Sequence, residues 1–340
     1  MPPVNLYSDT QTRPTEGMRA AIASAVVGDE QRGLDPTTSA LEERVASLLG
    51  FPAAVFLPSG TMCNQIALRL HARPGGDELL LDLSAHPITS EAGGPAQVSG
   101  LMVQTLDGDR GVFTGAQLEA ALRPVGNRYM PRSRVVSVEQ TSNRGGGRVW
   151  PLSVVCEVLE VARRHGLRAH MDGARLMNAV VASGVPAASY AGGFDTAWLD
   201  FTKGLGAPVG AVLVGSRSLI DEAWRWKQML GGALRQSGIV AAGCLYALDH
   251  HVDRLAEDHV HARLLADGLA ALPGVRIDPG LVETNIVFFE VDDAPGLVAR
   301  IADRVDIQAT GPMQIRAVTH LDVTRADIES ALEAFAQELG

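Results

Sequence analysis

The sequence has few cysteines, no long apolar run and a deficit of basic residues, and each shortage excludes a class of protein. Its three cysteines, Cys63, Cys156 and Cys244, are an odd number and lie far apart. We therefore expect buried free thiols in a reducing cytoplasm, and neither a disulfide framework nor a metal cluster. No stretch reaches the roughly 18 uninterrupted apolar residues of a membrane span, and the N-terminus has no signal-peptide pattern. With 29 basic against 39 acidic residues, the net charge of −10 disfavours nucleic acid or an anionic membrane as the main partner.

The remaining composition is that of an ordinary globular protein. Hydrophobic residues make up 46% and charged residues 20% of the 340 positions, and we find no internal repeat or low-complexity tract. The length predicts two domains, or one large domain with an additional lobe.

The order of the expected elements predicts an α/β fold with a smaller α+β domain after it. Strand-like runs alternate with helical patterns, which is typical of a mostly parallel central sheet flanked by helices. The expected strands are 53–57, 78–81, 134–138, 167–171 and 211–214, and the expected helices are 15–25, 39–49, 62–70, 114–122, 152–165, 219–230, 239–248 and 252–272. After these come strands 285–291 and 314–318, with helices at 294–302 and from Thr324 onward. We divide the chain into an N-terminal arm (1–38) that does not pack as a layer, a large domain (39–254) and a small domain (255–340).

One lysine occupies an unusual place in this pattern. Lys203 follows the apolar run 196–201 and precedes a glycine-rich turn that ends at Gly210. A lysine after a strand is ordinarily a solvated surface residue. A lysine held against apolar walls can instead lose its proton and attack carbonyl groups, as Schiff-base lysines do.

Other polar residues fall at the carboxyl ends of the expected strands, where parallel sheets bind ligands. They are Ser59, Gly60 and Thr61 at a helix start, His86, Asp172 and Arg175. Taken singly, they are explained by a helix cap, a loop histidine and a helix-end ion pair. Taken together with Lys203, they match the needs of pyridoxal phosphate, which requires an amine, an anion site at a helix N-terminus, a carboxylate for the pyridine nitrogen and a flat group over the ring.

Eight motifs resemble those of the L-threonine aldolases, which belong to the aspartate-aminotransferase-like, fold-type I pyridoxal-phosphate enzymes. The resemblance extends from about residue 5 to about residue 325, and its motifs lie at 6–14, 35–37, 58–61, 91–94, 170–178, 203–210, 235–238 and 318–322. The motifs Asp172-Gly-Ala-Arg175 and Lys203-Gly-Leu-Gly206 are the most specific among them.

The resemblance implies a role for each matching residue. Lys203 would be the Schiff-base lysine, Asp172 the partner of the pyridine nitrogen and His86 the ring-stacking residue. Ser59, Gly60 and Thr61 would bind the phosphate of pyridoxal 5'-phosphate, and Arg235 would reach the phosphate bound by a neighbouring subunit. The amino-acid carboxylate would be held by Ser8, Arg175 and Arg316, with Arg175 also lying beside the cofactor. A homodimer with shared active sites, or a homotetramer, is implied as well.

The chain departs from the family pattern around the substrate β-carbon. Ser142 replaces a histidine that contacts the β-hydroxyl, Arg32 replaces a tyrosine, Ser90 an aromatic residue and Gln228 a lysine. Serine can exchange hydrogen bonds, but it is no base near neutral pH. We therefore expect an aldolase that cleaves a β-hydroxy-α-amino acid to glycine and an aldehyde, with altered side-chain preference and with Ser142 and Arg32 near the substrate.

Two alternatives remain open from the sequence. The same cofactor could serve β-elimination, dehydration or racemisation of a related amino acid, since it stabilises a carbanion whichever bond at Cα is broken. The protein could also bind the cofactor without turnover, although the presence of Lys203 disfavours this.

Overall fold

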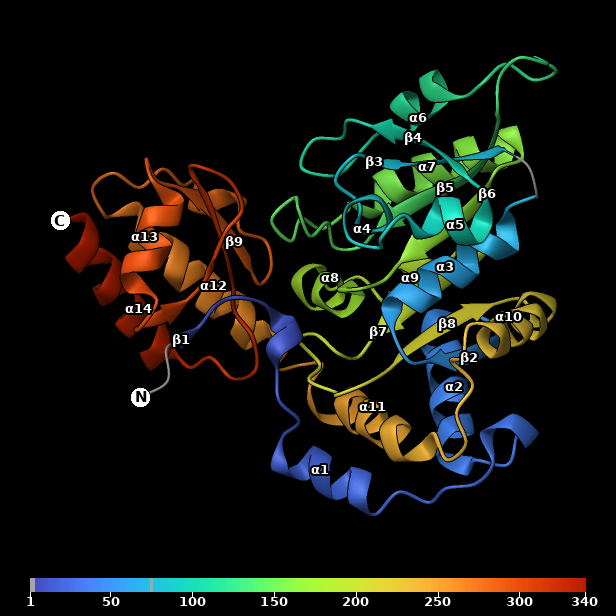
Figure 1. Ribbon diagram of the computed structural model, residues 1–340, viewed down its shortest axis with the longest axis horizontal. Helices are drawn as coiled ribbons and strands as arrows, with labels where there is room; N and C mark the ends of the chain where they lie inside the picture. The colour runs from blue at the N-terminus through green and yellow to red at the C-terminus, as the bar shows by residue number, and fades with distance from the viewer. Residues whose placement is uncertain (1–3, 74–75) are drawn as a thin grey trace.

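The computed structural model describes residues 4–73 and 76–340, and its large domain is built on one seven-stranded sheet (Figure 1). The strand order is β2-β8-β7-β6-β5-β3-β4. All neighbouring pairs are parallel except those of β8, which runs antiparallel to both β2 and β7. The strands are β2 (Ala53–Leu57), β3 (Asp77–Asp82), β4 (Met102–Leu106), β5 (Arg132–Glu139), β6 (Arg168–Asp172), β7 (Thr196–Asp200) and β8 (Ala211–Gly215). The expected mostly parallel α/β sheet is confirmed.

Helices cover both faces of this sheet because alternate residues of each strand point to opposite sides. In β2, Phe56 packs in the core beneath α2 (Pro36–Leu49) and α11 (Gly238–His250). Its neighbours Val55 and Leu57 pack with α3 (Gly60–His71) and α10 (Arg217–Met229) on the other face. The remaining helices of this domain are α1 (Glu16–Ala23), α4 (His86–Thr89), α5 (Gly94–Ser99), α6 (Gly115–Ala121), α7 (Leu152–His165), α8 (Leu176–Ser183) and α9 (Ala187–Ala191), with 3-10 turns η1 (Asp9–Gln11) and η2 (Glu30–Arg32).

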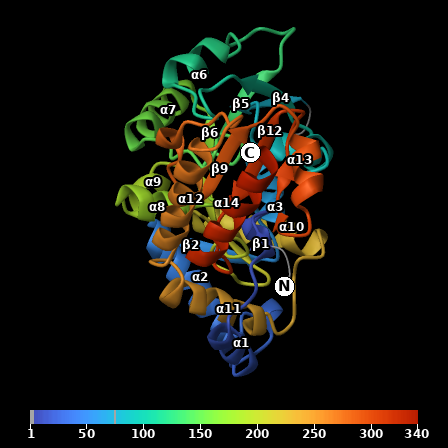
Figure 2. The ribbon, with the colours of Figure 1, turned by 90° about the vertical axis from the view of Figure 1, so that its left-hand side faces the viewer.

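The C-terminal elements form a second lobe with its own apolar core. In Figure 2 this lobe faces the viewer, in orange and red. A three-stranded antiparallel sheet in the order β11-β12-β9 packs against helices, as expected for an α+β unit. Its elements are α12 (Leu255–Ala270), η3 (Pro279–Leu281), β9 (Ile286–Glu290), α13 (Ala294–Ile301), β10 (Val305–Asp306), β11 (Gln308–Ala309), β12 (Gln314–Val318) and α14 (Arg325–Leu339). We propose a domain boundary near residue 255, because Leu255 belongs to the large core and Ala262 to the small one.

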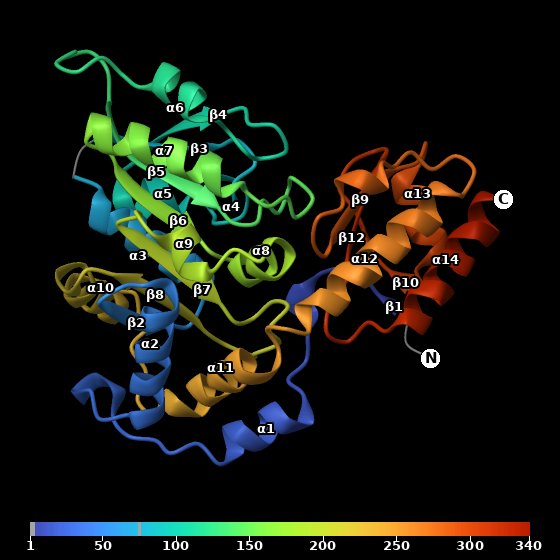
Figure 3. The same ribbon diagram turned by 180° about the vertical axis from the view of Figure 1, so that it is seen from behind.

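The expectation that the N-terminal segment does not pack is wrong. β1 (Val4–Asn5) pairs with β10, and Leu6 is fully buried in the core of the small lobe. Farther on, α1 lies along α11, where Met18 is buried in the large core (Figure 3). The segment therefore ties the two lobes together, because its apolar residues are divided between two cores.

One expectation about the cysteines is also wrong. All three thiols are free, and Cys63 and Cys244 are buried, but Cys156 is exposed on the outer side of α7. Among the residues that the structure places, no helix has the length and hydropathy needed to span a membrane.

Candidate active site

The reactive lysine predicted from the sequence lies beyond the carboxyl end of β7, beside the end of β6. The side chain of Lys203 is 17% exposed, and its Nζ donates to Asp200, the last residue of β7. Nζ also lies 5.7 Å from the centroid of the Trp198 ring. The backbone carbonyl of Lys203 accepts a 2.9 Å hydrogen bond from the Thr12 hydroxyl, so the N-terminal segment helps to fix the lysine loop.

Asp172, the last residue of β6, is a buried carboxyl group with an unusual proton affinity. Burial, and then the nearby carboxylate of Glu139 on β5, raise the pKa of Asp172 to about 7. Its oxygens accept hydrogen bonds from Asn64 Nδ2 at 2.7 Å and from the amide of Ala174 at 3.0 Å. A buried carboxylate of this kind is stabilised by a cationic N–H partner. A pyridinium nitrogen is such a partner.

His86 begins α4 and is oriented by two glutamates. Its backbone N–H donates to Glu139 at 2.7 Å, and its Nδ1 lies 2.8 Å from Glu91 Oε1. The hydrogen bond to Glu91 raises the pKa of His86, against the opposing effect of partial burial. The imidazole therefore has a fixed orientation, as a ring-stacking residue requires.

Asn64, on the first turn of α3, links these groups and was not predicted from the sequence. Its Nδ2 donates to both Glu91 and Asp172, each at 2.7 Å, and its Oδ1 accepts from Trp198 Nε1 at 2.7 Å. A single buried amide therefore sets the positions of the carboxyl groups of Asp172 and Glu91. Two features of the sequence could have indicated the role of Asn64. They are the motif Glu91-Ala-Gly-Gly94, which contains its partner Glu91, and the position of Asn64 just after the Ser59-Gly60-Thr61 turn.

The N-terminus of α3 is open, as expected for an anion site. Ser59 caps the helix by accepting from the Met62 amide at 3.2 Å, and Thr61 is exposed. A Cβ at Gly60 would collide with the Trp198 ring, so only glycine lets the helix start approach this close to β7. Free amides at a helix N-terminus suit a phosphate group.

Arg175 and Arg316 lie close to each other near Lys203, with Asp9 between them. Arg175 is buried and makes a bidentate pair with Asp9, at 2.7 and 2.6 Å. Burial alone would raise the pKa of Asp9, but the Arg175 guanidinium holds it well below its usual range. Asp9 lies within the motif at residues 6–14, but the sequence predicts no role for it, because its partner Arg175 is 166 residues away.

Arg316 retains an unused donor. Its Nη2 donates to Asn143 at 2.7 Å and its Nη1 to the carbonyl of Tyr7 at 3.3 Å, whereas its buried Nε has no hydrogen-bond partner among the described residues. Burial and the nearby Arg175 lower the pKa of Arg316 to about 10. Ser8 is buried on the segment next to Tyr7, with its hydroxyl oxygen accepting from Thr10 at 2.9 Å. An unpaired, desolvated guanidinium N–H is suited to a carboxylate ligand.

Ser142 is buried in the turn after β5, where its hydroxyl oxygen accepts a hydrogen bond from its own loop. Its Oγ accepts from the Gly145 amide at 3.2 Å, and a Cβ at Gly111 would collide with it. The turn instead directs the next residue, Asn143, toward Arg316.

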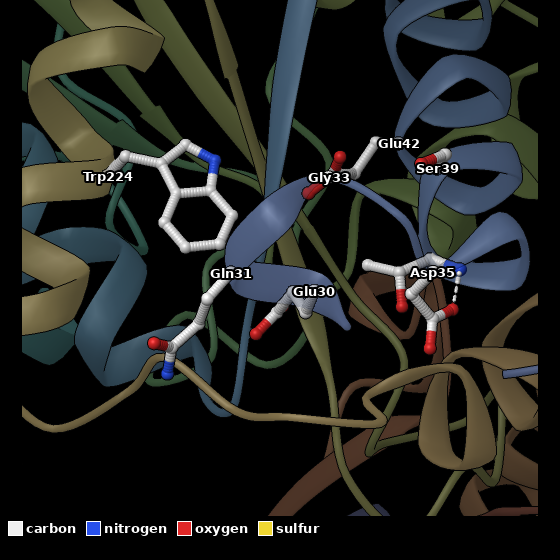
Figure 4. Close-up of a pocket in the computed structure, with 8 residues that line it drawn as sticks. Glu30, Gln31, Gly33, Asp35, Ser39, Glu42 and Trp224 are labelled. Atoms are coloured by element: carbon white, nitrogen blue, oxygen red, sulfur yellow. Dashed lines mark hydrogen bonds between the residues drawn. The ribbon is translucent and has the colours of Figure 1, made fainter. Parts of the chain in front are cut away.

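Arg32 and Arg235 are exposed. The chain segments that carry them are hydrogen-bonded to each other. Glu30 joins the segments: its backbone N–H donates to the Arg235 carbonyl at 2.8 Å, and its carboxylate accepts from the Leu234 amide at 2.7 Å. The same carboxylate pairs with Lys227, which is completely buried, with Nζ 4.2 Å from the Trp224 ring centroid. A pocket of about 280 Å³ lies beside Glu30 and is lined by Glu30, Gln31, Glu42 and Trp224 among others. Figure 4 shows these side chains.

Breaking the buried Glu30–Lys227 pair is expected to destabilise the protein strongly. Glu30→Gln should lower the free energy of unfolding by about 3–5 kcal/mol, because it leaves the Lys227 ammonium buried without its counter-charge. The double variant Glu30→Gln with Lys227→Met should lose less, since no unpaired charge remains. Urea unfolding checks both, and equal losses in the two variants would contradict this explanation.

Glu42 makes stability depend on pH. Burial raises its pKa from 4.5 to about 7, and the hydrogen bond from the Phe56 amide and the attraction of Lys227 only partly offset this. Because its folded-state pKa lies above the unfolded value, the stabilisation is full below about pH 4.5 and is lost as pH rises through 7. Glu42→Gln should therefore match the wild type near pH 4 and exceed its unfolding free energy by about 3 kcal/mol at pH 8. The exposed neighbour variant Glu43→Gln should show no such trend.

The residues around Lys203 fit pyridoxal phosphate by their chemistry. They offer an amine, a buried carboxyl group for a pyridinium N–H, an oriented imidazole and an open helix N-terminus beside a glycine that tolerates no side chain. The unpaired Nε of Arg316 provides a place for a substrate carboxylate.

Known proteins match the chain along nearly its whole length. Low-specificity L-threonine aldolase 1 of Arabidopsis thaliana is 38% identical, over 99% of this chain and 96% of that protein. The low specificity L-threonine aldolase of Escherichia coli strain K12 is also 38% identical, over 96% of each chain. The solved threonine aldolase of Leishmania major shares the fold, with a TM-score of 0.84 at 20% identity over 99% of both chains. The family model described as beta-eliminating lyase matches residues 5–294, and this chain belongs to that family, together with the low-specificity L-threonine aldolases that resemble it.

Proposed function

We propose that the protein is a pyridoxal-phosphate-dependent lyase that cleaves a β-hydroxy-α-amino acid to glycine and an aldehyde. The observation that carries this is that the Lys203 amine follows the end of β7, and that the neighbouring parallel strand β6 ends at the buried Asp172 carboxyl. Relatives at 38% identity that are named low-specificity L-threonine aldolases support it.

Each side chain of the site has a separate role in binding the cofactor. Lys203 would hold the cofactor covalently, Asp172 would keep its ring nitrogen protonated, and His86 would stack on its ring. Ser59, Gly60 and Thr61 hold the phosphate at the start of α3. When bound, pyridoxal phosphate supplies an electron sink for the electron pair released at the substrate Cα.

The substrate carboxylate is held by arginines. Arg316 offers its free Nε, and Arg175, now paired with Asp9, can share its guanidinium with an incoming carboxylate. Ser8 adds its hydroxyl hydrogen. Two guanidiniums in the same buried region would orient the carboxylate and so restrict how the substrate Cα is presented.

Cleavage needs a base for the β-hydroxyl proton, and Ser142 cannot be that base. The imidazole of His86 can hold the proton at Nε2, since its Nδ1 is bound to Glu91. Water and the cofactor phosphate are the other possible acceptors. We propose that the surroundings of Ser142, Arg32 and Ser90 shift the preferred β-substituent away from that of threonine.

An assay of glycine release tests the reaction. Threonine, allo-threonine and phenylserine are each incubated with the loaded enzyme, and glycine and aldehyde are quantified in equal amounts if the proposal holds. No glycine from any β-hydroxy amino acid would refute it. A second candidate, β-elimination, is supported by the description of the family model and would be recognised by a keto acid with ammonia. Loss of chirality without aldehyde would indicate racemisation.

We also propose a homodimer with shared sites, or a tetramer of two such dimers, in a reducing cytoplasm. Exposed apolar residues lie within six positions of Arg32 or Arg235 in the sequence, including Val26, Leu34, Met229 and Ile239. The three free thiols are compatible with a reducing compartment. Elution at monomer mass with full activity would contradict the assembly.

A further inference from the structure

Asp200 is a buried carboxylate that touches Lys203 and has no part in the proposed chemistry. Its Oδ1 accepts from the backbone N–H of Thr202 at 3.1 Å and from the Thr202 hydroxyl at 2.9 Å. Its Oδ2 accepts from Lys203 Nζ. One oxygen thus fixes the carboxylate at the end of β7, and the other is directed at the lysine.

The groups packed around Asp200 leave Lys203 as its cationic partner. Cys63 from α3 and Cys244 from α11 face it as neutral thiols, because burial raises the pKa of both well above the usual value. Arg175, at the start of α8, is engaged by Asp9, and Asp172 on the adjacent strand is bound by Asn64. Among the described residues, no other ammonium or guanidinium donates to Asp200.

Removing the lysine from this carboxylate is therefore costly. Whenever the lysine nitrogen is covalently engaged elsewhere, Asp200 keeps only its two bonds from Thr202. A buried charge that loses its partner is destabilised far more than an exposed one. The loss of this ion pair therefore shifts the equilibrium toward the state in which Lys203 is not covalently bound and pairs with Asp200.

We propose that Asp200 is a positioning residue. Each time a substrate amine displaces Lys203 from the cofactor, Asp200 pairs with the released Lys203 ammonium and so favours the exchange of lysine for amino acid. This rests on the proposed attachment of pyridoxal phosphate to Lys203. The exchange conserves charge and protons, because the substrate enters as an ammonium ion and Lys203 leaves as one. The bond between the Lys203 nitrogen and the cofactor carbon breaks, and a bond between the substrate nitrogen and the same carbon forms.

The test measures glycine binding, which needs no turnover. Protein loaded with pyridoxal phosphate is titrated with glycine and followed by visible absorption. Asp200→Asn keeps the shape and the Thr202 bonds but removes the charge, and should weaken the apparent affinity for glycine by about tenfold. Its affinity for pyridoxal phosphate, measured by equilibrium dialysis, should be at least that of the wild type.

Three further variants separate this role from a structural one. Asp200→Glu restores the charge and should recover part of the glycine affinity. Thr202→Val loosens the carboxylate without removing it and should weaken glycine binding roughly threefold, which keeps the idea testable if Asp200→Asn does not fold. Asp195→Asn, which alters a carboxylate held by Arg168 just before β7 begins, should bind glycine like the wild type.

The outcomes are distinct. Unchanged glycine affinity in Asp200→Asn, or in Thr202→Val if the former is unfolded, overturns the role of Asp200. Equal weakening of glycine and cofactor binding in Asp200→Asn also overturns it, since that would mark a general loss of site structure. Failure of the wild-type protein to bind pyridoxal phosphate would instead refute the proposed function.

Discussion

Lys203→Ala is expected to lose covalent cofactor attachment and to lower kcat by at least about 10³-fold, as removal of a covalent catalytic group does in other enzymes. The Lys203 amine pairs with Asp200 and lies 5.7 Å from the centroid of the Trp198 ring. Removing it leaves the start of α3 and Asp172 able to retain the cofactor without a covalent bond. The visible band of the attached cofactor should disappear, and borohydride should no longer fix cofactor to the protein.

Lys203→Arg is the matched control for this result. Arginine keeps a positive charge beside Asp200, so the fold and the ion pair should be maintained, but a guanidinium is always protonated and cannot act as the nucleophile. Both variants should therefore be inactive, while Lys203→Arg retains more of the wild-type unfolding free energy. A Lys203→Ala variant with undiminished function would favour cofactor binding without turnover.

The general position of the site was predictable from the sequence, because parallel strands bring their carboxyl ends to one edge of the sheet. This reasoning predicts that Asp172 and Lys203 lie at that edge, and the structure has Asp172 as the last residue of β6 and Lys203 three residues after the end of β7. The direction of β8 was not predictable, since an apolar run such as 211–214 has the same pattern whether it is parallel or antiparallel to its neighbours.

The hydrogen-bond partners of the site residues were not predictable for a related reason. Asn64 looked like a polar residue in a helix, and Asp9 and Asp200 looked like turn residues. Each acts through a contact that depends on side-chain direction or on distant parts of the chain: Asn64 with Asp172, Asp9 with Arg175, and Asp200 with Lys203. Sequence spacing carries no information about such contacts.

The N-terminal segment illustrates the same limit. Its proline- and glycine-rich composition indicated an unpacked arm, yet Leu6 and Met18 are fully buried. Single apolar residues in an irregular segment give no periodicity, so a pattern-based reading cannot detect their burial.

Co-expression of two impaired variants is expected to recover activity if neighbouring subunits share the site. Arg235→Ala alone should lower activity roughly 100-fold at limiting cofactor, because it removes a charged contact to the phosphate, and Lys203→Ala alone should be inactive. In a mixed dimer, the subunit carrying Arg235→Ala keeps its own Lys203 and receives Arg235 from its partner. That site is intact, whereas the other lacks both residues.

Random pairing of equal amounts makes half of the dimers mixed, and each mixed dimer has one intact site of two. Co-expressed variants should therefore show about a quarter of the wild-type activity. Separately purified variants, mixed without subunit exchange, should show no recovery. The exposure of Arg235 and its fixed place beside Glu30 motivate the prediction. If Arg235 serves its own chain, every subunit of the mixed dimer lacks one essential residue and no activity returns, so the experiment separates the two arrangements regardless of the preferred substrate.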